Sequence, residues 1–356
     1  MGSFRTTLAL SVVLVHLSAR HCLVGGAVAV QMFYCVSGFL ITYVLTCGNN
    51  YKTKRSFYIN RALRIYPVYY TVAALALISK LLSDIEFKQV FSAIPFCWKM
   101  ALGLINVSIF GQDDVMFLAL HSGQVHFAVN FRISELPLYQ GLLVPQAWTL
   151  GLELCFYTLA PLIVIKAWRV WIALAISVSV RMTLIFMGLA FQDPWSYRFF
   201  PSELMWFMLG ALSMRLLLPR WETFLDQKPR LTSLLVFSVL VLLALYQVLP
   251  GQGDPGDLKS MMFIGLIVLF MPAMFVFQKQ SPFDKQIGEL SYPIYICHML
   301  VISLASATLT RYSLNQGTIA AVTKLTSVII AAYALNRFVA MPLEKVRVRF
   351  RRPILA

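Results

Sequence analysis

The sequence predicts an all-α protein that crosses a membrane about ten times. Hydrophobic residues make up 59% of the 356 residues and charged residues only 13%, and the apolar runs are too long and too numerous for a soluble core. The formal net charge is +15. Because the cations lie between the apolar runs, they fit the positive-inside rule for membrane proteins, and nucleic acid is not expected as a partner.

Each apolar run that is long enough for a membrane helix is taken as a span. The runs are 5–20, 28–46, 65–83, 148–165, 170–190, 203–218, 231–249, 258–277, 288–310 and 318–341. The segment 89–110 is also apolar, but Pro95, Lys99 and Asn106 interrupt it. We therefore expect it to be re-entrant or interfacial. No linker or repeat divides the chain, so residues 1–356 are expected to form a single transmembrane domain.

The basic residues predict the orientation of these spans. The loop 47–64 and the tail KVRVRFRR are rich in Lys and Arg, and both are expected on the cytoplasmic side. If residues 84–147 form a single segment on the outer side, the basic loop and the basic tail both lie in the cytoplasm. This arrangement gives about ten spans with both termini cytoplasmic. The acidic, turn-rich segment GQGDPGD (251–257) then lies outside. The cysteines lack paired spacing and the histidines lack metal-ligand spacing, so neither disulfides nor a metal site is expected.

The first span carries a cation and a titratable group on one stripe. Ten residues separate Arg5 from His16, which places them roughly 16 Å apart on the same helix face. Polar groups inside a membrane helix predict a functional site, and here they are expected to face one shared passage through the bilayer. The alternative is a snorkelling arginine and a histidine that hydrogen-bonds a neighbouring helix.

A pair of arginines lies at the expected cytoplasmic boundary. In FYINRALRIYP, Arg61 and Arg64 are three residues apart and share a helical face. Two guanidinium groups on one face suit phosphates, which they bind by bidentate hydrogen bonds. Ordinary positive-inside charge or contact with lipid headgroups is the alternative.

A carboxylate stands inside the span that begins near residue 148. Glu153 shares a face with Thr149 and Tyr157, and a carboxylate in an apolar helix is costly unless it is paired or protonated. Trp148 at the start of this span also fits an aromatic belt. In the second span, Ser37 is next to a glycine, and close helix packing is the alternative to a site role there.

Two further segments carry candidate site residues. In LSYPIYICHML, His298 lies seven residues after Ser291 on the same face, close to Tyr292. An intramembrane histidine there is either a site residue or an interhelical hydrogen-bond partner. Arg181 lies in the middle of another span and needs a partner or a water-filled cavity.

These stretches, taken in order, resemble the membrane-bound acyltransferase family 3, whose bacterial members O-acylate carbohydrates and lipids. Arg5 and His16 match the R-x10-H pattern of the family, and Arg61 and Arg64 match its R-x-x-R loop. VQMFYCVSGFLI, WTLGLELCFY and LSYPIYICHMLV look like its other signature blocks. Leu154 replaces a second carboxylate that many members have after the position of Glu153.

The resemblance implies an O-acetyltransferase of the bacterial inner membrane. The expected donor is acyl-CoA, most often acetyl-CoA, with its phosphates on Arg5, Arg61 and Arg64. His16 is the expected general base, and Glu153 is expected to orient His16 or to bind the acceptor. Ser37 and Tyr292 are candidate donors to the oxyanion. The full set of expected substrate-binding residues is Ser37, Trp148, Tyr157, Arg181, Tyr292 and His298.

The expected acceptor is a sugar hydroxyl on an exopolysaccharide, O-antigen or lipid-linked glycan, with membrane lipids as further partners and no metal. A secondary transporter or flippase is the main alternative, because it also explains many spans with intramembrane Glu153 and Arg181. It predicts inverted repeats, which the sequence does not show, and it gives no reason for a phosphate-binding arginine pair. A structural membrane partner without chemistry is a third possibility, and it predicts that His16 tolerates replacement.

Overall fold

The structure is a computed structural model that describes residues 1–17, 23–47, 51, 53–251 and 257–350. Within these residues, seven helices are long and apolar enough to cross a membrane, so the chain is a multi-pass, mainly α-helical membrane protein. Three further expected spans form shorter helices of 15, 16 and 13 residues, and the number ten remains a prediction. Residues 18–20 of the first expected span, 252–256 of the acidic segment and 351–352 of the tail lie outside the described residues.

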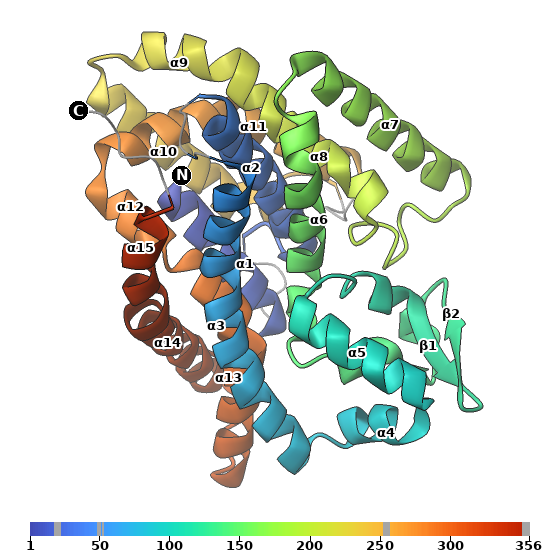
Figure 1. Ribbon diagram of the computed structural model, residues 1–356. Coiled ribbons are helices and arrows are strands. Elements are labelled where there is room, and N and C mark those ends of the chain that lie inside the picture. Colours follow the sequence, from blue (N-terminus) through green and yellow to red (C-terminus); the bar gives the residue numbers. More distant parts are fainter. Residues whose placement is uncertain (18–22, 48–50, 52, 252–256, 351–356) are drawn as a thin grey trace.

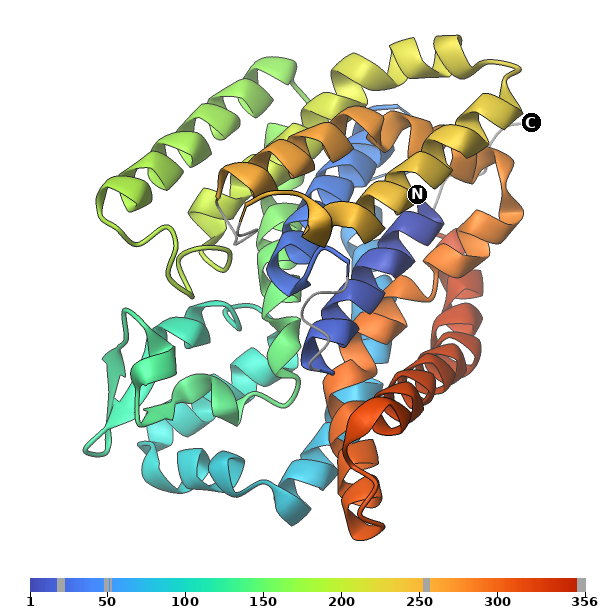
Figure 2. The same ribbon diagram turned by 180° about the vertical axis from the view of Figure 1, so that it is seen from behind.

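The helices of the bundle coincide broadly with the apolar runs of the sequence, although the third begins at Lys54, within the expected loop 47–64 (Figure 1). They are α1 (Gly2–His16), α2 (Gly26–Thr46), α3 (Lys54–Ser83), α6 (Trp148–Ile163), α7 (Ala167–Phe186), α8 (Phe200–Leu212), α9 (Leu218–Leu225), α10 (Pro229–Leu245), α11 (Leu258–Gln280), α12 (Pro282–Gly288), α13 (Ser291–Arg311), α14 (Gly317–Leu335) and α15 (Met341–Val348). The start of α1 and the end of α15 lie at the same end of the bundle (Figures 1 and 2), as an even number of crossings requires.

Residues 84–147, here called the lobe, form a separate body at the opposite end of the bundle (Figure 1). The segment 89–110 divides between α4 (Ile85–Ala93) and α5 (Phe96–Ser108). The two helices have 9 and 13 residues, which is too short to cross a hydrocarbon core of about 30 Å. The segment 89–110 is thus divided between two short helices, and its re-entrant or interfacial position stays a prediction.

The lobe also contains a small sheet, which the all-α expectation missed. Strands β1 (Leu118–His121), β2 (Gln124–Phe127) and β3 (Leu136–Pro137) pair antiparallel in the order β2-β1-β3. Ser122 and Gly123 between β1 and β2 both have positive φ angles, as a tight hairpin turn requires. Short 3-10 turns connect the remaining segments: Asp114–Phe117, Phe131–Ile133, Leu138–Gly141 and Pro145–Ala147.

A row of tyrosines on α3 attaches the lobe to the bundle. Tyr66, Tyr69 and Tyr70 donate hydrogen bonds of 2.6, 2.6 and 2.9 Å to the backbone carbonyls of residues 106–108. The last carbonyls of a helix have no partner within the helix itself. The tyrosines therefore satisfy the end of α5 and fix the direction in which the chain leaves α3.

Helices α2 and α8 cross at two glycines. A Cβ added to Gly38 would lie 1.9 Å from the carbonyl oxygen of Phe207, and a Cβ added to Gly210 would lie 1.9 Å from that of Cys35. Only glycine permits so close an approach of two backbones. The packing explanation for Gly38 is thus confirmed, and this crossing fixes the position of the neighbouring Ser37.

The tight crossing predicts a large difference between two identical substitutions. Gly210→Ala should lower the free energy of unfolding by about 1–3 kcal/mol, because the methyl group forces α2 and α8 apart. Gly265→Ala on α11 is the control, since nothing lies within 4 Å of its added Cβ, and alanine there should stabilise the helix slightly. Thermal unfolding in detergent measures both variants, and equal melting temperatures would contradict the proposed backbone contact.

Candidate functional site

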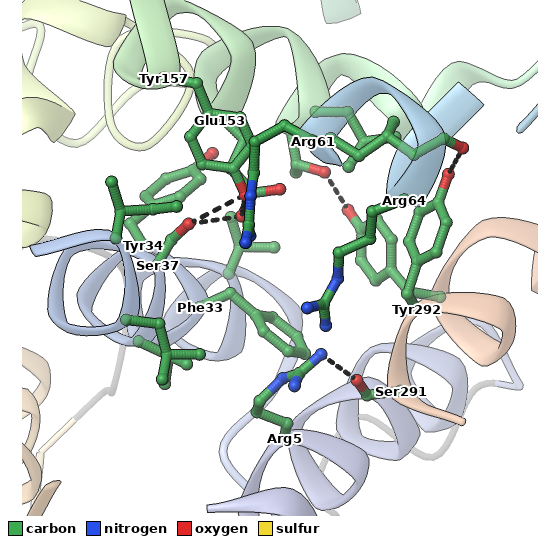
Figure 3. Close-up of a pocket in the computed structure, with 18 residues that line it drawn as sticks. Arg5, Phe33, Tyr34, Ser37, Arg61, Arg64, Glu153, Tyr157, Ser291 and Tyr292 are labelled. Atoms are coloured by element: carbon green, nitrogen blue, oxygen red, sulfur yellow. Dashed lines mark hydrogen bonds between the residues drawn. The ribbon is translucent and has the colours of Figure 1, made fainter. Parts of the chain in front are cut away.

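A narrow pocket lies inside the bundle and gathers side chains from α1, α2, α3, α6 and α13 (Figure 3). Its volume is about 110 Å³, which admits a thin flexible chain but not a nucleotide. Most of the residues singled out in the sequence line it: Arg5, Ser37, Arg61, Arg64, Glu153, Tyr157 and Tyr292. The structure therefore joins residues that lie far apart in the chain.

Three arginines point toward the same space in the pocket (Figure 3). Arg5 donates to the hydroxyl of Ser291 at 2.9 Å, and Arg61 donates to that of Tyr51 at 3.3 Å. Among the described residues, none of the three guanidinium groups has a carboxylate oxygen within 4.0 Å. Guanidinium groups carry five donors each, so this end of the pocket has spare capacity for an anion.

Local structure fixes the position of each arginine. The Arg61 and Arg64 side chains leave early turns of α3, whose start is closed by a capping box of Thr53 and Ser56. Arg5 lies in the first turns of α1, which packs on α12. There the backbone N–H and the hydroxyl of Ser3 donate to Asp284 at 2.8 and 2.5 Å.

Glu153 is the carboxylate of the pocket. Its Oε1 accepts hydrogen bonds from Ser37 at 2.6 Å and from Tyr157 at 2.8 Å. It therefore holds these two hydroxyls and does not orient His16, as one sequence-based alternative expected. With three cations against one carboxylate, the lining carries an excess of positive charge, which favours a ligand with negative groups.

The hydroxyls expected to stabilise an oxyanion are already engaged. Tyr292 donates to the carbonyl of Ile65 at 2.7 Å, which ties α13 to α3. Ser37 donates to Glu153. Each hydroxyl has a single hydrogen to donate, so the structure does not support either side chain as a free oxyanion donor in this conformation.

Two residues that the sequence reasoning did not assign to the site form the floor of the pocket. Thr149 donates to the hydroxyl of Tyr295 at 3.0 Å, and Tyr295 donates to the carbonyl of Gln146 at 3.2 Å. The sequence signal was present, because Tyr295 lies between Ser291 and His298 on one face of α13. The hydrogen bonds connect α13 to the start of α6.

His16 does not line the pocket, which corrects the expectation of one passage shared with Arg5. The two residues do share a helix face, because Arg5 contacts Ser291 and His16 contacts His298, seven residues further along α13. The ring centroids of the histidines are 5.0 Å apart. His16 is exposed and His298 is fully buried. The histidine pair lies beyond Tyr295, one turn of α13 past the floor.

Arg181 was expected to bind substrate, and the structure places it outside the pocket. Its guanidinium forms a buried ion pair with Glu203 and donates to the carbonyl of Ser196 at 2.8 Å. Gln31 on α2 also donates to Glu203, at 3.1 Å. The partner that the sequence required for Arg181 is therefore Glu203, and the pair connects α7 with α8.

Trp148 also lies outside the pocket. The guanidinium carbon of Arg198 lies 4.2 Å from the centroid of its indole ring, a cation–π contact. Arg198 in turn pairs with Asp193, which also accepts hydrogen bonds from Arg132 of the lobe. Burial alone would raise the pKa of Asp193, but the two arginines outweigh it and hold that pKa below its usual value. This cluster attaches the lobe to the loop before α8.

Comparisons with known proteins agree with the sequence motifs. A family model described as an acyltransferase domain, Acyl_transf_3, matches residues 3–337. An uncharacterised protein of Haemophilus influenzae is 28% identical over 163 residues, or 45% of this chain and 58% of that protein. The chain thus aligns with little more than half the length of that relative. No solved structure gives a significant match. The family match favours acyl transfer over the transporter alternative.

The buried ion pair predicts that Arg181 and Glu203 are structural. Glu203→Ala alone should cost about 3–5 kcal/mol of stability, because it leaves a buried guanidinium unpaired. The double variant Arg181→Met/Glu203→Met should recover most of that loss, since apolar side chains of similar size often replace a buried pair. Thermal unfolding and transfer activity are both measured. A double variant that folds but has lost activity would restore the substrate-binding role.

Proposed function

The chain belongs to acyltransferase family 3, and we propose that it moves an acetyl group from acetyl-CoA to a hydroxyl of a cell-surface or lipid-linked glycan. The protein lies in the bacterial inner membrane with both termini in the cytoplasm. The donor enters the pocket from the side of the arginines, which is then the cytoplasmic side, and the acceptor approaches His16 from the opposite side.

The convergence of Arg5, Arg61 and Arg64 is the observation that carries this proposal. Coenzyme A has a diphosphate and a further phosphate at one end and a thin pantetheine arm at the other. Guanidinium groups without carboxylate partners match phosphate oxygens in charge and in geometry. A cavity of about 110 Å³ accepts the arm and leaves the nucleotide at the mouth. The thioester then points toward the floor and the histidine pair.

His16 is the general base of the proposed reaction. Its Nδ1 lies 2.9 Å from the carbonyl oxygen of Val12, and a carbonyl only accepts, so Nδ1 carries the proton and Nε2 is the basic atom. The exposed ring is open to an acceptor hydroxyl. Removing the hydroxyl proton during attack on the thioester carbon is the usual task of a histidine base. Because Tyr295 separates His16 from the pocket, the floor must open for the thioester to pass.

The activity itself is tested with purified protein, labelled acetyl-CoA and a panel of glycans. Arg64→Ala should weaken coenzyme A binding by about 1.5–3 kcal/mol, the range for a hydrogen bond to a charged group. Arg220→Ala is the matched control, because Arg220 is exposed on α9 and outside the pocket. Calorimetric titration in detergent gives both affinities. Equal dissociation constants for the two variants would remove the phosphate role from Arg64.

His16→Ala should reduce transfer about 10²–10⁴-fold, the usual contribution of a general base. Coenzyme A affinity should be unchanged, because His16 lies outside the pocket. His126→Ala is the control, since this histidine is exposed on β2 of the lobe. Mass spectrometry of the glycan products measures transfer. Wild-type turnover in the His16 variant would exclude the base assignment.

A further inference from the structure

His298 has one nitrogen without a partner in the interior of the protein. The side chain is fully buried, and within the described part of the chain its Nε2 makes no hydrogen bond. Buried polar atoms are nearly always paired, and an exception calls for a physical reason. The neighbouring ring is that of His16, 5.0 Å away between centroids.

The backbone gives both histidines the same tautomer. Nδ1 of His298 lies 2.7 Å from the carbonyl oxygen of Tyr295, just as Nδ1 of His16 lies 2.9 Å from that of Val12. Carbonyl oxygens only accept hydrogen bonds, so each Nδ1 carries a hydrogen and each Nε2 has a lone pair. Two imidazoles whose Nε2 atoms both lack a proton therefore lie in ring contact, 5.0 Å apart between centroids.

His298 lies between the two halves of the proposed reaction. On one side is the exposed His16, which faces the acceptor hydroxyl. On the other side is Tyr295, whose ring lies 5.8 Å from that of His298 and lines the pocket. The sulfur that needs a proton belongs to the arm that reaches past Tyr295 from the pocket, and His298 contacts both Tyr295 and His16.

We propose that His298 is a second catalytic residue that carries the proton from His16 to the departing thiolate of the coenzyme. The inference rests on the proposed acyltransferase function. His16 Nε2 takes the hydroxyl proton as the oxygen bonds to the thioester carbon. The carbon–sulfur bond then breaks, and the sulfur keeps the electron pair. The proton passes from His16 to Nε2 of His298 and on to the sulfur, which leaves both imidazoles neutral.

The other polar groups of the pocket are occupied or unsuitable for this task. Glu153 accepts from Ser37 and Tyr157, and Tyr292 donates to a backbone carbonyl. Arginines do not release protons at ordinary pH. Among the described residues near the floor, His298 offers a buried ring nitrogen with an unpartnered lone pair, and imidazole nitrogens both take up and release protons.

Two substitutions separate proton transfer from packing. His298→Asn keeps an amide donor for the Tyr295 carbonyl and lacks an atom at the position of Nε2. His298→Gln places an amide at that position, which hydrogen-bonds but does not take up a proton. Both variants, with His126→Gln as the control, are assayed with two donors. Acetyl-CoA has a thiolate leaving group that needs a proton, and p-nitrophenyl acetate has a phenolate that leaves without one.

Both His298 variants should lose about 10²-fold or more in kcat with acetyl-CoA, keep the wild-type KM, and retain near-wild-type rates with p-nitrophenyl acetate. His16→Gln should lose activity with both donors. A His298→Gln variant that is fully active with acetyl-CoA would overturn the relay alone, and so would equal losses with the two donors in folded protein. If the wild type transfers nothing from acetyl-CoA to any glycan, the proposed function fails and the relay fails with it.

Discussion

Helix α13 holds the site together through polar contacts spaced along about two turns. Ser291 accepts from Arg5, Tyr292 donates to α3, Tyr295 bonds with α6, and His298 contacts His16. These partners lie on α1, α3 and α6, and the two on α1 come from opposite ends of that helix. A rotation of α13 by one residue would break all four contacts at once. One helix therefore positions the arginine end of the pocket, the floor and the histidine pair together.

The two kinds of arginine in the bundle differ in their partners. Arg181 is buried with Glu203 and Gln31, so its charge is neutralised inside the protein and serves helix packing. Arg5 and Arg64 line a cavity without a carboxylate in contact, among the described residues. Leaving a cation unpaired in a low-dielectric environment is costly. In the pocket, an anionic ligand can offset this cost.

Periodicity in the sequence predicted the helices and the pairs that share one helical face. Arg61 with Arg64, Glu153 with Tyr157, and Arg5 with His16 all follow from spacing, because residues on one helix keep their relative directions. Contacts between helices carry no such signal. Nothing in the sequence connects Arg181 with Glu203, although the two residues lie on consecutive helices. Nothing connects Trp148 with the cation of Arg198 either. The structure places Arg181 and Trp148 outside the pocket, and their assignment as substrate-binding residues stays a prediction.

The same limit applies to the lobe and to the floor of the pocket. The hairpin turn at 122–123 is a recognisable strand signal, but the expectation of a single outer segment over 84–147 included no strand. The floor depends on a hydroxyl–hydroxyl contact between α6 and α13, which arises only when the two helices pack together. Sequence spacing gave the list of polar residues on each helix, and tertiary packing decided which of them share a compartment.

The separation into two compartments has a chemical consequence for the proposed reaction. A histidine base also activates water, so water competes with the acceptor hydroxyl for a thioester that reaches the base. In this structure His16 is exposed, and the pocket that contains the arginines ends at the hydrogen-bonded floor. A thioester held in the pocket is thus kept away from the base until Tyr295 moves. Opening the floor breaks two hydrogen bonds between neutral groups, each worth about 0.5–1.5 kcal/mol net, and separates the buried Tyr295 ring from Phe33 and His298. An acceptor bound beside His16 favours the open state only by the difference in its affinity for the two states.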